Sequence, residues 1–166
     1  MGLDLSTITG LSIVEFGRKV VFVEEIQFKK ERGMQRICNI AERIVTVRDL
    51  YKPDLIVIEE LFIGRTSSAI VLAEISAIVR YFLWLDDSKF ITLPAATLKR
   101  WLTGKGNSQK DVMMMEVYKQ FEFESKTNNI ADAIALGMYG LCTLGDTFSS
   151  AQKTIATQVE KIKVEK

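Results

Sequence analysis

The chain has 166 residues, 48% of them apolar and 26% charged, with a formal net charge of +1. This length and composition are typical of one globular domain, and no apolar run approaches the ~20 residues of a membrane-spanning helix, so we expect a cytoplasmic protein. Histidine is absent, which excludes Ser-His-Asp triads and His-ligated zinc. Carboxylates that bind hard cations remain the simplest route to catalysis.

The first half of the chain predicts three short strands, a helix and a buried strand. The strands are expected at residues 2–6, 11–16 and 19–28, where β-branched and aromatic residues are frequent. An amphipathic helix follows at 34–51, because apolar residues recur there at helical spacing. The continuous apolar run 55–58 predicts a strand buried on both faces, which ends in Glu59 and Glu60.

The second half predicts further helices around one more strand. A helix is expected from 66–68 to about 84, a strand at 90–93, and helices at 95–102, after Ser108 and at 128–144. Ser108 and Asp111 have the spacing of a capping box. The predicted fold is therefore α/β, with a mixed five-stranded sheet, helices on both faces, and the first strand central between the hairpin and the strand that ends at Glu59.

Three carboxylates come from three separate predicted elements. Asp4 lies on the first strand, before Gly10, a glycine that can adopt positive φ; Glu59 or Glu60 ends the fourth strand; and Asp132 lies in an alanine-rich helix. Each alone could be a capping residue, a solvated strand end or the partner of a lysine. In this topology all three converge at one sheet edge, and converging carboxylates repel one another unless a cation lies between them.

Four sequence blocks follow one another along residues 1–144. They are GLDLSTITG at 2–10, VIEELF at 57–62, GKGNSQKD at 104–111 and NIADA at 129–133. Together they resemble the RuvC family of Holliday junction resolvases, which have the ribonuclease H-like fold. The short form without histidine is similar to a phage-type member, for which the cytoplasm would be that of the host. Residues 1–144 would be the nuclease domain and 145–166 a C-terminal helical extension or tail.

The resemblance implies a homodimeric endonuclease that nicks two symmetric strands of a four-way DNA junction. Its cofactor would be Mg2+, with two ions bound and Mn2+ able to substitute. Asp4, Glu59 and Asp132 match three of the family's four metal-binding acids. The fourth position holds Asn129, where cellular members commonly have an aspartate. An amide still offers a carbonyl oxygen but removes one negative charge, and natural variation and deliberate inactivation both remain open as its origin.

The resemblance also implies DNA-contacting residues. Lys99 and Lys110 match phosphate-binding lysines near the catalytic acids, and Lys110 would neutralise charge on the reacting phosphate. Phe62 matches an aromatic residue that stacks on junction bases, although a core position is equally compatible with the sequence. Lys105, in a glycine loop whose N–H groups could also face phosphate, and Arg65 complete the predicted DNA-binding set.

Three other functions remain open. DLSTITG also resembles the phosphate loop of sugar kinases, actin and Hsp70, but those proteins need two such domains and this chain has room for one. Asn129 leaves open a catalytically weak or inactive module that only binds junctions. A nuclease with less selectivity for branched DNA is the third alternative.

Overall fold

The sheet of this protein, seen in a computed structural model that describes residues 1–61 and 67–159, has five strands in the order β3-β2-β1-β4-β5. The strands are β1 (Gly2–Asp4), β2 (Thr9–Glu15), β3 (Lys19–Ile26), β4 (Ile56–Glu60) and β5 (Phe90–Pro94). The β2 strand is antiparallel to β1 and β3, whereas β1, β4 and β5 are parallel. The predicted mixed sheet with a central first strand is confirmed.

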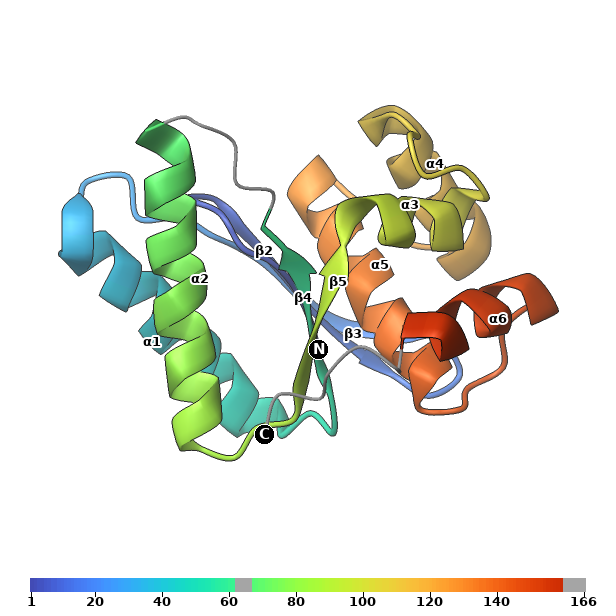
Figure 1. Ribbon diagram of the computed structural model, residues 1–166, viewed down its shortest axis with the longest axis horizontal. Helices are drawn as coiled ribbons and strands as arrows, with labels where there is room; N and C mark the ends of the chain where they lie inside the picture. Colours follow the sequence, from blue (N-terminus) through green and yellow to red (C-terminus); the bar gives the residue numbers. More distant parts are fainter. Residues whose placement is uncertain (62–66, 160–166) are drawn as a thin grey trace.

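Helices cover both faces of the sheet (Figure 1). On one face lie α1 (Gly33–Tyr51) and α2 (Ser67–Leu85). On the other lie α3 (Ala95–Thr103), α4 (Lys110–Phe121), α5 (Asn128–Thr143) and α6 (Ser150–Val159). None of the helices in the described ranges combines the length and apolar character that crossing a membrane needs.

Each face of the sheet buries its own apolar core, because successive strand residues point to opposite faces. Leu3 and Ile58 belong to the core under α1 and α2, and Val57 belongs to the core under α5. The apolar side of the helix predicted at 34–51 is buried as expected, through Ile37, Ile40, Ala41, Ile44 and Val47. Consequently Gly2, Asp4 and Glu59, which alternate with Leu3 and Ile58, belong to the α5 face.

The backbone of α5 lies directly on β1 and β2, and two glycines permit this approach. A Cβ atom at Gly2 would overlap the carbonyl oxygen of Ala133, and one at Gly10 would overlap that of Asn129. Ser12 adds a buried hydrogen bond, since its Oγ donates to the Ala133 carbonyl over 2.7 Å. The expected role of Gly10 is wrong: positive φ occurs at other glycines, and Gly10 is needed for space.

The helix starts on the α5 side differ from the sequence prediction. The capping box at Ser108 and Asp111 is wrong, because α4 begins one residue later with Gln109 as a cap that makes no side-chain hydrogen bond. Ser108 Oγ instead donates to the carbonyl of Lys105 over 2.9 Å and so closes the preceding loop. The α5 helix has the cap that the sequence analysis missed, since Thr127 Oγ1 accepts a hydrogen bond from the Ile130 N–H.

The α6 helix closes the core beneath α3. Phe148, which precedes α6, packs its ring against Trp101 with centroids 5.5 Å apart, and Ala156 is buried. Gln152 Nε2 also donates to Gln120 Oε1 on α4 over 3.0 Å. The helix therefore supports α3 and α4, and the division of the chain after residue 144 stays a prediction.

Gly10→Ala should destabilise the protein by about 3 kcal/mol, because the added methyl group meets helix backbone that cannot rotate away. The comparator is Ser12→Ala, which removes one buried hydrogen bond on the same strand without adding an atom and should cost about 1 kcal/mol. Urea denaturation of both variants measures the difference. Equal losses would contradict direct backbone contact at Gly10.

Candidate active site

One row of positions across the sheet carries the candidate site. Asp4 pairs with Gly10 across β1 and β2, and Gly10 pairs with Glu25 across β2 and β3. On the other side of β1, the parallel register that pairs Leu3 with Ile58 brings Glu59 next to Asp4. Cross-strand neighbours point to the same face, so Glu59, Asp4 and Glu25 all lie on the α5 face.

The α5 helix adds Asp132 above this row. Asn129 lies over Gly10 and Ala133 over Gly2, so the turn between them passes over the end of β1. Asp132 is in that turn and is half-buried. Three carboxylates that are far apart in the sequence therefore meet at the carboxyl end of β1 and β4, the edge where open α/β sheets bind ligands.

Burial makes the Asp4 carboxylate reluctant to ionise. The pKa of Asp4 is raised from its ordinary 3.8 to about 7, chiefly by burial and also by the negative charge of Asp132, whereas Lys110 acts in the opposite direction. Desolvation disfavours a charged group, and a like charge nearby adds to that cost. Ionised Asp4 is therefore costly unless a cation compensates it.

The other two carboxylates are perturbed in the same direction. Burial raises the pKa of Glu59 to about 7, with smaller contributions from Asp4 and Asp132, while Lys99 and Lys110 lower it. Burial also raises the pKa of Asp132, opposed by Lys110 and Lys99. The three acids and two lysines thus interact electrostatically as one cluster.

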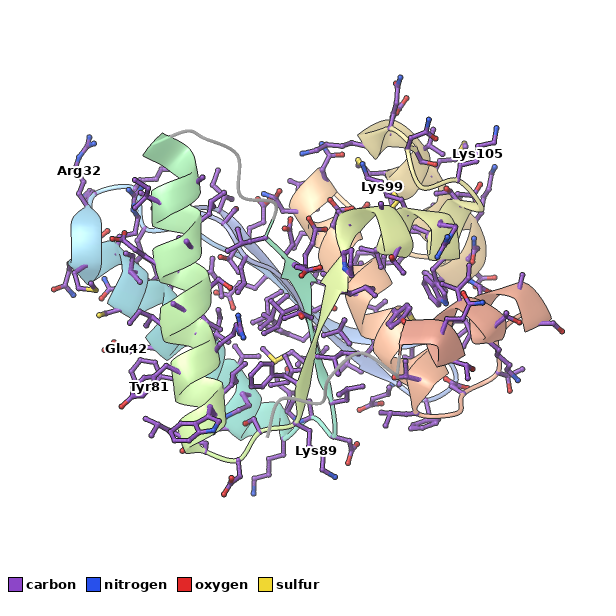
Figure 2. The ribbon with its side chains drawn as sticks, viewed as in Figure 1. Arg32, Glu42, Tyr81, Lys89, Lys99 and Lys105 are labelled. Atoms are coloured by element: carbon purple, nitrogen blue, oxygen red, sulfur yellow. The ribbon has the colours of Figure 1, made fainter. Side chains whose placement is uncertain are left out.

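Lysines from α3 and α4 partly offset the acidic charge. Lys99 is half-buried on α3, and Lys110 is exposed in the first turn of α4. Figure 2 shows Lys99 and Lys105 on the side of the molecule that α3 and α4 form. Lys105 is exposed in the loop between these helices, and none of the three acids has its pKa shifted by it.

The first two backbone N–H groups of the glycine loop, those of Gly104 and Lys105, form hydrogen bonds within the protein. The Gly104 N–H donates to the Arg100 carbonyl over 2.9 Å as the C-cap of α3. The Lys105 N–H donates to Thr103 Oγ1 over 3.1 Å. The expected presentation of these two N–H groups to phosphate is therefore wrong, and the DNA contact predicted for the Lys105 side chain stays a prediction.

Asn129, the predicted fourth metal ligand, has a partner that the sequence analysis did not anticipate. Its Nδ2 donates to Glu25 Oε1 on β3 over 3.0 Å. Thr127 Oγ1 donates to the same carboxylate oxygen over 2.7 Å. The amide therefore connects the row of acids with the edge strand, and its role as a ligand stays a prediction.

The donor chemistry of the cluster fits a hard divalent cation. Carboxylate oxygens are the ligands that Mg2+ and Mn2+ prefer, and a cation would offset the burial and the mutual repulsion that raise the pKa values of these groups. Among the residues described, no three acidic or cysteine side chains already converge on a single ion position. Asp4, Glu59 and Asp132 are therefore the candidate ligands for such an ion.

Two predicted DNA-binding residues, Phe62 and Arg65, lie outside the described residues. The segment that contains them connects the end of β4 with the start of α2. Their predicted roles therefore stay predictions.

Sequence comparison decides the family. The profile described as "Crossover junction endodeoxyribonuclease RuvC" matches residues 1–139. The chain belongs to the RuvC family. A protein of that description from Brachyspira hyodysenteriae is 30% identical over 112 residues, which cover 67% of this chain and 70% of the relative. One from Hydrogenovibrio crunogenus is 28% identical over 141 residues, which cover 81% and 82% of the two chains.

The fold agrees with this assignment. A solved structure described as "T. thermophilus RuvC in complex with Holliday junction substrate" superposes with a TM-score of 0.72 at 17% identity, over 82% of this chain and 88% of the other. The ribonuclease H-like fold predicted from the sequence is confirmed. The RuvC family is that of the crossover junction endodeoxyribonucleases, and nucleases of this family depend on divalent metal ions. Membership of this family argues against the ATP-binding alternative.

The buried carboxylates of this RuvC-family chain should make the metal-free protein less stable as pH rises. Asp4 and Glu59 have folded-state pKa values of about 7, above their ordinary values of 3.8 and 4.5, so the folded state binds more protons between pH 4 and 7. In EDTA at pH 8, Asp4→Asn should be more stable than wild type by about 1–3 kcal/mol, with little difference at pH 4.

Thermal denaturation across this pH range measures the effect. Glu60→Gln is the matched control, because Glu60 is exposed at the end of the same β4 strand, and it should leave the pH dependence unchanged. Equal stability of wild type and Asp4→Asn at pH 8 would contradict a burial cost at Asp4.

Proposed function

We propose that this chain resolves four-way DNA junctions by Mg2+-dependent hydrolysis of phosphodiester bonds, with Asp4, Glu59 and Asp132 as the metal-binding catalytic acids. The observation that carries the proposal is the electrostatic coupling of these three half-buried carboxylates with Lys99 and Lys110 at one sheet edge. Membership of the RuvC family supports the choice of substrate. A DNA substrate in turn supports the cytoplasm of a bacterium, or of a phage-infected host, as the place of action.

Each residue of the cluster has a definite task in this proposal. Asp4 is central in the row, beside Glu59 and beneath Asp132, and is therefore the natural shared ligand of two ions. When bound, Mg2+ supplies an activated water and a counter-charge for the leaving 3′ oxygen. Lys110 neutralises charge that develops on the phosphate, and Lys99 holds the same strand through its phosphates.

The remaining DNA contacts are proposed to surround this cluster. Lys105, exposed on the loop between α3 and α4, would bind phosphates farther from the cut. Phe62 and Arg65 come shortly after β4 in the chain, the strand that provides Glu59. We propose that Phe62 stacks on a base released at the crossover and that Arg65 binds phosphate, which favours a junction over a linear duplex.

Asp4→Asn should abolish cleavage of a four-way junction in Mg2+ while junction binding stays intact or tightens, because a charge that repels phosphate is lost. Cleavage of a labelled junction and a matched linear duplex, with binding measured in parallel in EDTA, gives both readouts. Glu60→Gln again serves as the control and should cut normally. Mg2+ should also raise the melting temperature of wild type more than that of Asp4→Asn.

The alternatives predict different results. Wild-type protein that binds junctions but does not cut them in Mg2+ or Mn2+ would be a junction-binding module. Equal cleavage of the junction and the duplex would indicate a less selective nuclease. Normal cutting by Asp4→Asn would overturn the proposed site.

A homodimer is the proposed assembly, because one subunit supplies one catalytic cluster and a junction has two symmetric strands to cut. The outer face of α2 supports this assembly. Ile70, Tyr81 and Trp84 are 63%, 53% and 54% exposed. Together with Ala77, which lies between Ile70 and Tyr81, they follow one another at intervals of seven, four and three residues, which is the spacing of a helix-pairing seam. Tyr81 projects away from the sheet (Figure 2). This surface is remote from α3 and α4, so pairing leaves the DNA-facing side open.

Charge on this seam should separate the subunits. Tyr81→Glu with Trp84→Glu should sediment as a monomer at micromolar concentration, with circular dichroism like that of wild type. Leu50→Glu is the control, because Leu50 is 74% exposed on α1 and lies outside the seam. A double variant that remains dimeric would place the interface elsewhere.

A further inference from the structure

Asn129 and Glu25 form a pair that joins the catalytic helix to the edge strand. Asn129 Nδ2 donates to Glu25 Oε1 over 3.0 Å, although the two residues are 104 positions apart in the chain. The hydroxyl of Thr127, which also caps α5, donates to the same oxygen over 2.7 Å. Glu25 thus accepts two hydrogen bonds from the N-terminal end of α5, one from its N-cap and one from its first turn.

The register of the sheet places this pair beside the catalytic acids. Gly10 separates Asp4 from Glu25 in one cross-strand row, so their backbones are roughly 10 Å apart, twice the spacing of neighbouring strands. Gly10 has no side chain, and the backbone of Asn129 occupies the space above it. Asn129 therefore lies between Glu25 on one side and Asp4 on the other.

Hydrogen-bond chemistry fixes the orientation of the Asn129 amide in this position. An ionised carboxylate only accepts hydrogen bonds, whereas an amide has a donating end and an accepting end. Glu25 must therefore receive the NH2 group, and the carbonyl oxygen Oδ1 is the end of the amide that this contact does not use. An oxygen is the only atom of an asparagine side chain that binds a hard cation.

We propose that Glu25 is a positioning residue that holds the Asn129 amide with Oδ1 directed toward the Asp4–Asp132 side, where it completes the ligand set of the metal site. Glu25 also returns to this region the negative charge that an asparagine lacks. The inference rests on the proposed function of Asp4, Glu59 and Asp132, and it adds a residue of the edge strand to that site. Asn129 and Glu25 are then a matched pair, in which each residue is useful only with the other.

If Glu25 and Asn129 are a matched pair, Glu25→Gln should change the Mg2+ dissociation constant in opposite directions in the wild-type and Asn129→Asp backgrounds. With Asn129 present, Glu25→Gln removes the charge and lets the amide rotate either way, so the Mg2+ dissociation constant should rise about tenfold, as for other residues that orient a metal ligand. In the Asn129→Asp background, position 129 no longer has an NH2 group to donate, and its carboxylate faces Glu25. Glu25→Gln then supplies a donor and removes the repulsion, so the dissociation constant should fall.

Calorimetric titration of the metal-free full-length chain with Mg2+ measures these constants without reference to cleavage. Glu24→Gln is the matched control. It lies on the same strand but its carboxylate pairs with Arg43, at 2.8 Å, so its loss should lower stability and leave Mg2+ binding unchanged in both backgrounds.

The outcomes separate this inference from the proposed function. Wild-type protein that binds Mg2+, combined with Glu25→Gln effects of the same sign in both backgrounds or no effect in either, would overturn the pairing and leave the function standing. Wild-type protein that neither binds Mg2+ nor cuts junctions would overturn both. The proposal that Glu25 is the positioning residue would be supported if Glu25→Gln shifts the Mg2+ dissociation constant in opposite directions in the two backgrounds while Glu24→Gln leaves it unchanged in both.

Discussion

The direct contact between the α5 backbone and the β1–β2 hairpin is the constraint on which the site depends. Helices usually rest on a sheet through their side chains, but Gly2 and Gly10 let the carbonyls of Ala133 and Asn129 reach the strands themselves. This proximity brings Asp132 above Asp4, and it lets Asn129 reach Glu25 on the third strand. Gly2 and Gly10, which carry no chemical function of their own, therefore allow the acids to come together.

The cluster that this contact assembles is a source of instability in the absence of a cation. Three carboxylates share a partly buried edge, and the pKa values of Asp4 and Glu59 are raised to about 7 by burial and by neighbouring carboxylates. Lys99 and Lys110 offset part of this charge from α3 and α4, and those helices are supported in turn by α6 through Phe148 and Trp101. The aromatic core on that side of the sheet thus maintains the electrostatic arrangement of the active site.

Much of this architecture could be predicted from the sequence, because the signals are local. The apolar run before Glu59 and the helical spacing of Ile37, Ile40 and Ile44 define their elements without tertiary information. Chain order and strand polarity then bring Asp4, Glu59 and Asp132 to one edge. The resemblance of the four sequence blocks to the RuvC family indicates the same three acids independently.

Other features depend on contacts that no local pattern encodes. Glu25 follows Glu24 in a partly exposed strand, and only the three-strand register reveals that it reaches Asn129 while its neighbour reaches Arg43. Ser108 has the spacing of a cap, but its hydroxyl donates a hydrogen bond to the Lys105 carbonyl within the preceding loop. The seam on α2 is hidden in the sequence because that helix is apolar on nearly all sides, so its exposed residues resemble its buried ones.

The two tryptophans of the chain lie in environments that differ in a useful way. Trp84 is 54% exposed on α2, whereas Trp101 is 2% exposed, between Phe121, Tyr139 and Phe148. Indole fluorescence shifts to the red when the ring enters water, so the two emit at different wavelengths in the folded chain. Replacing either one by Phe leaves a single intrinsic reporter: Trp84 for events on the outer face of α2, and Trp101 for opening of the aromatic core beneath the lysine-bearing helices.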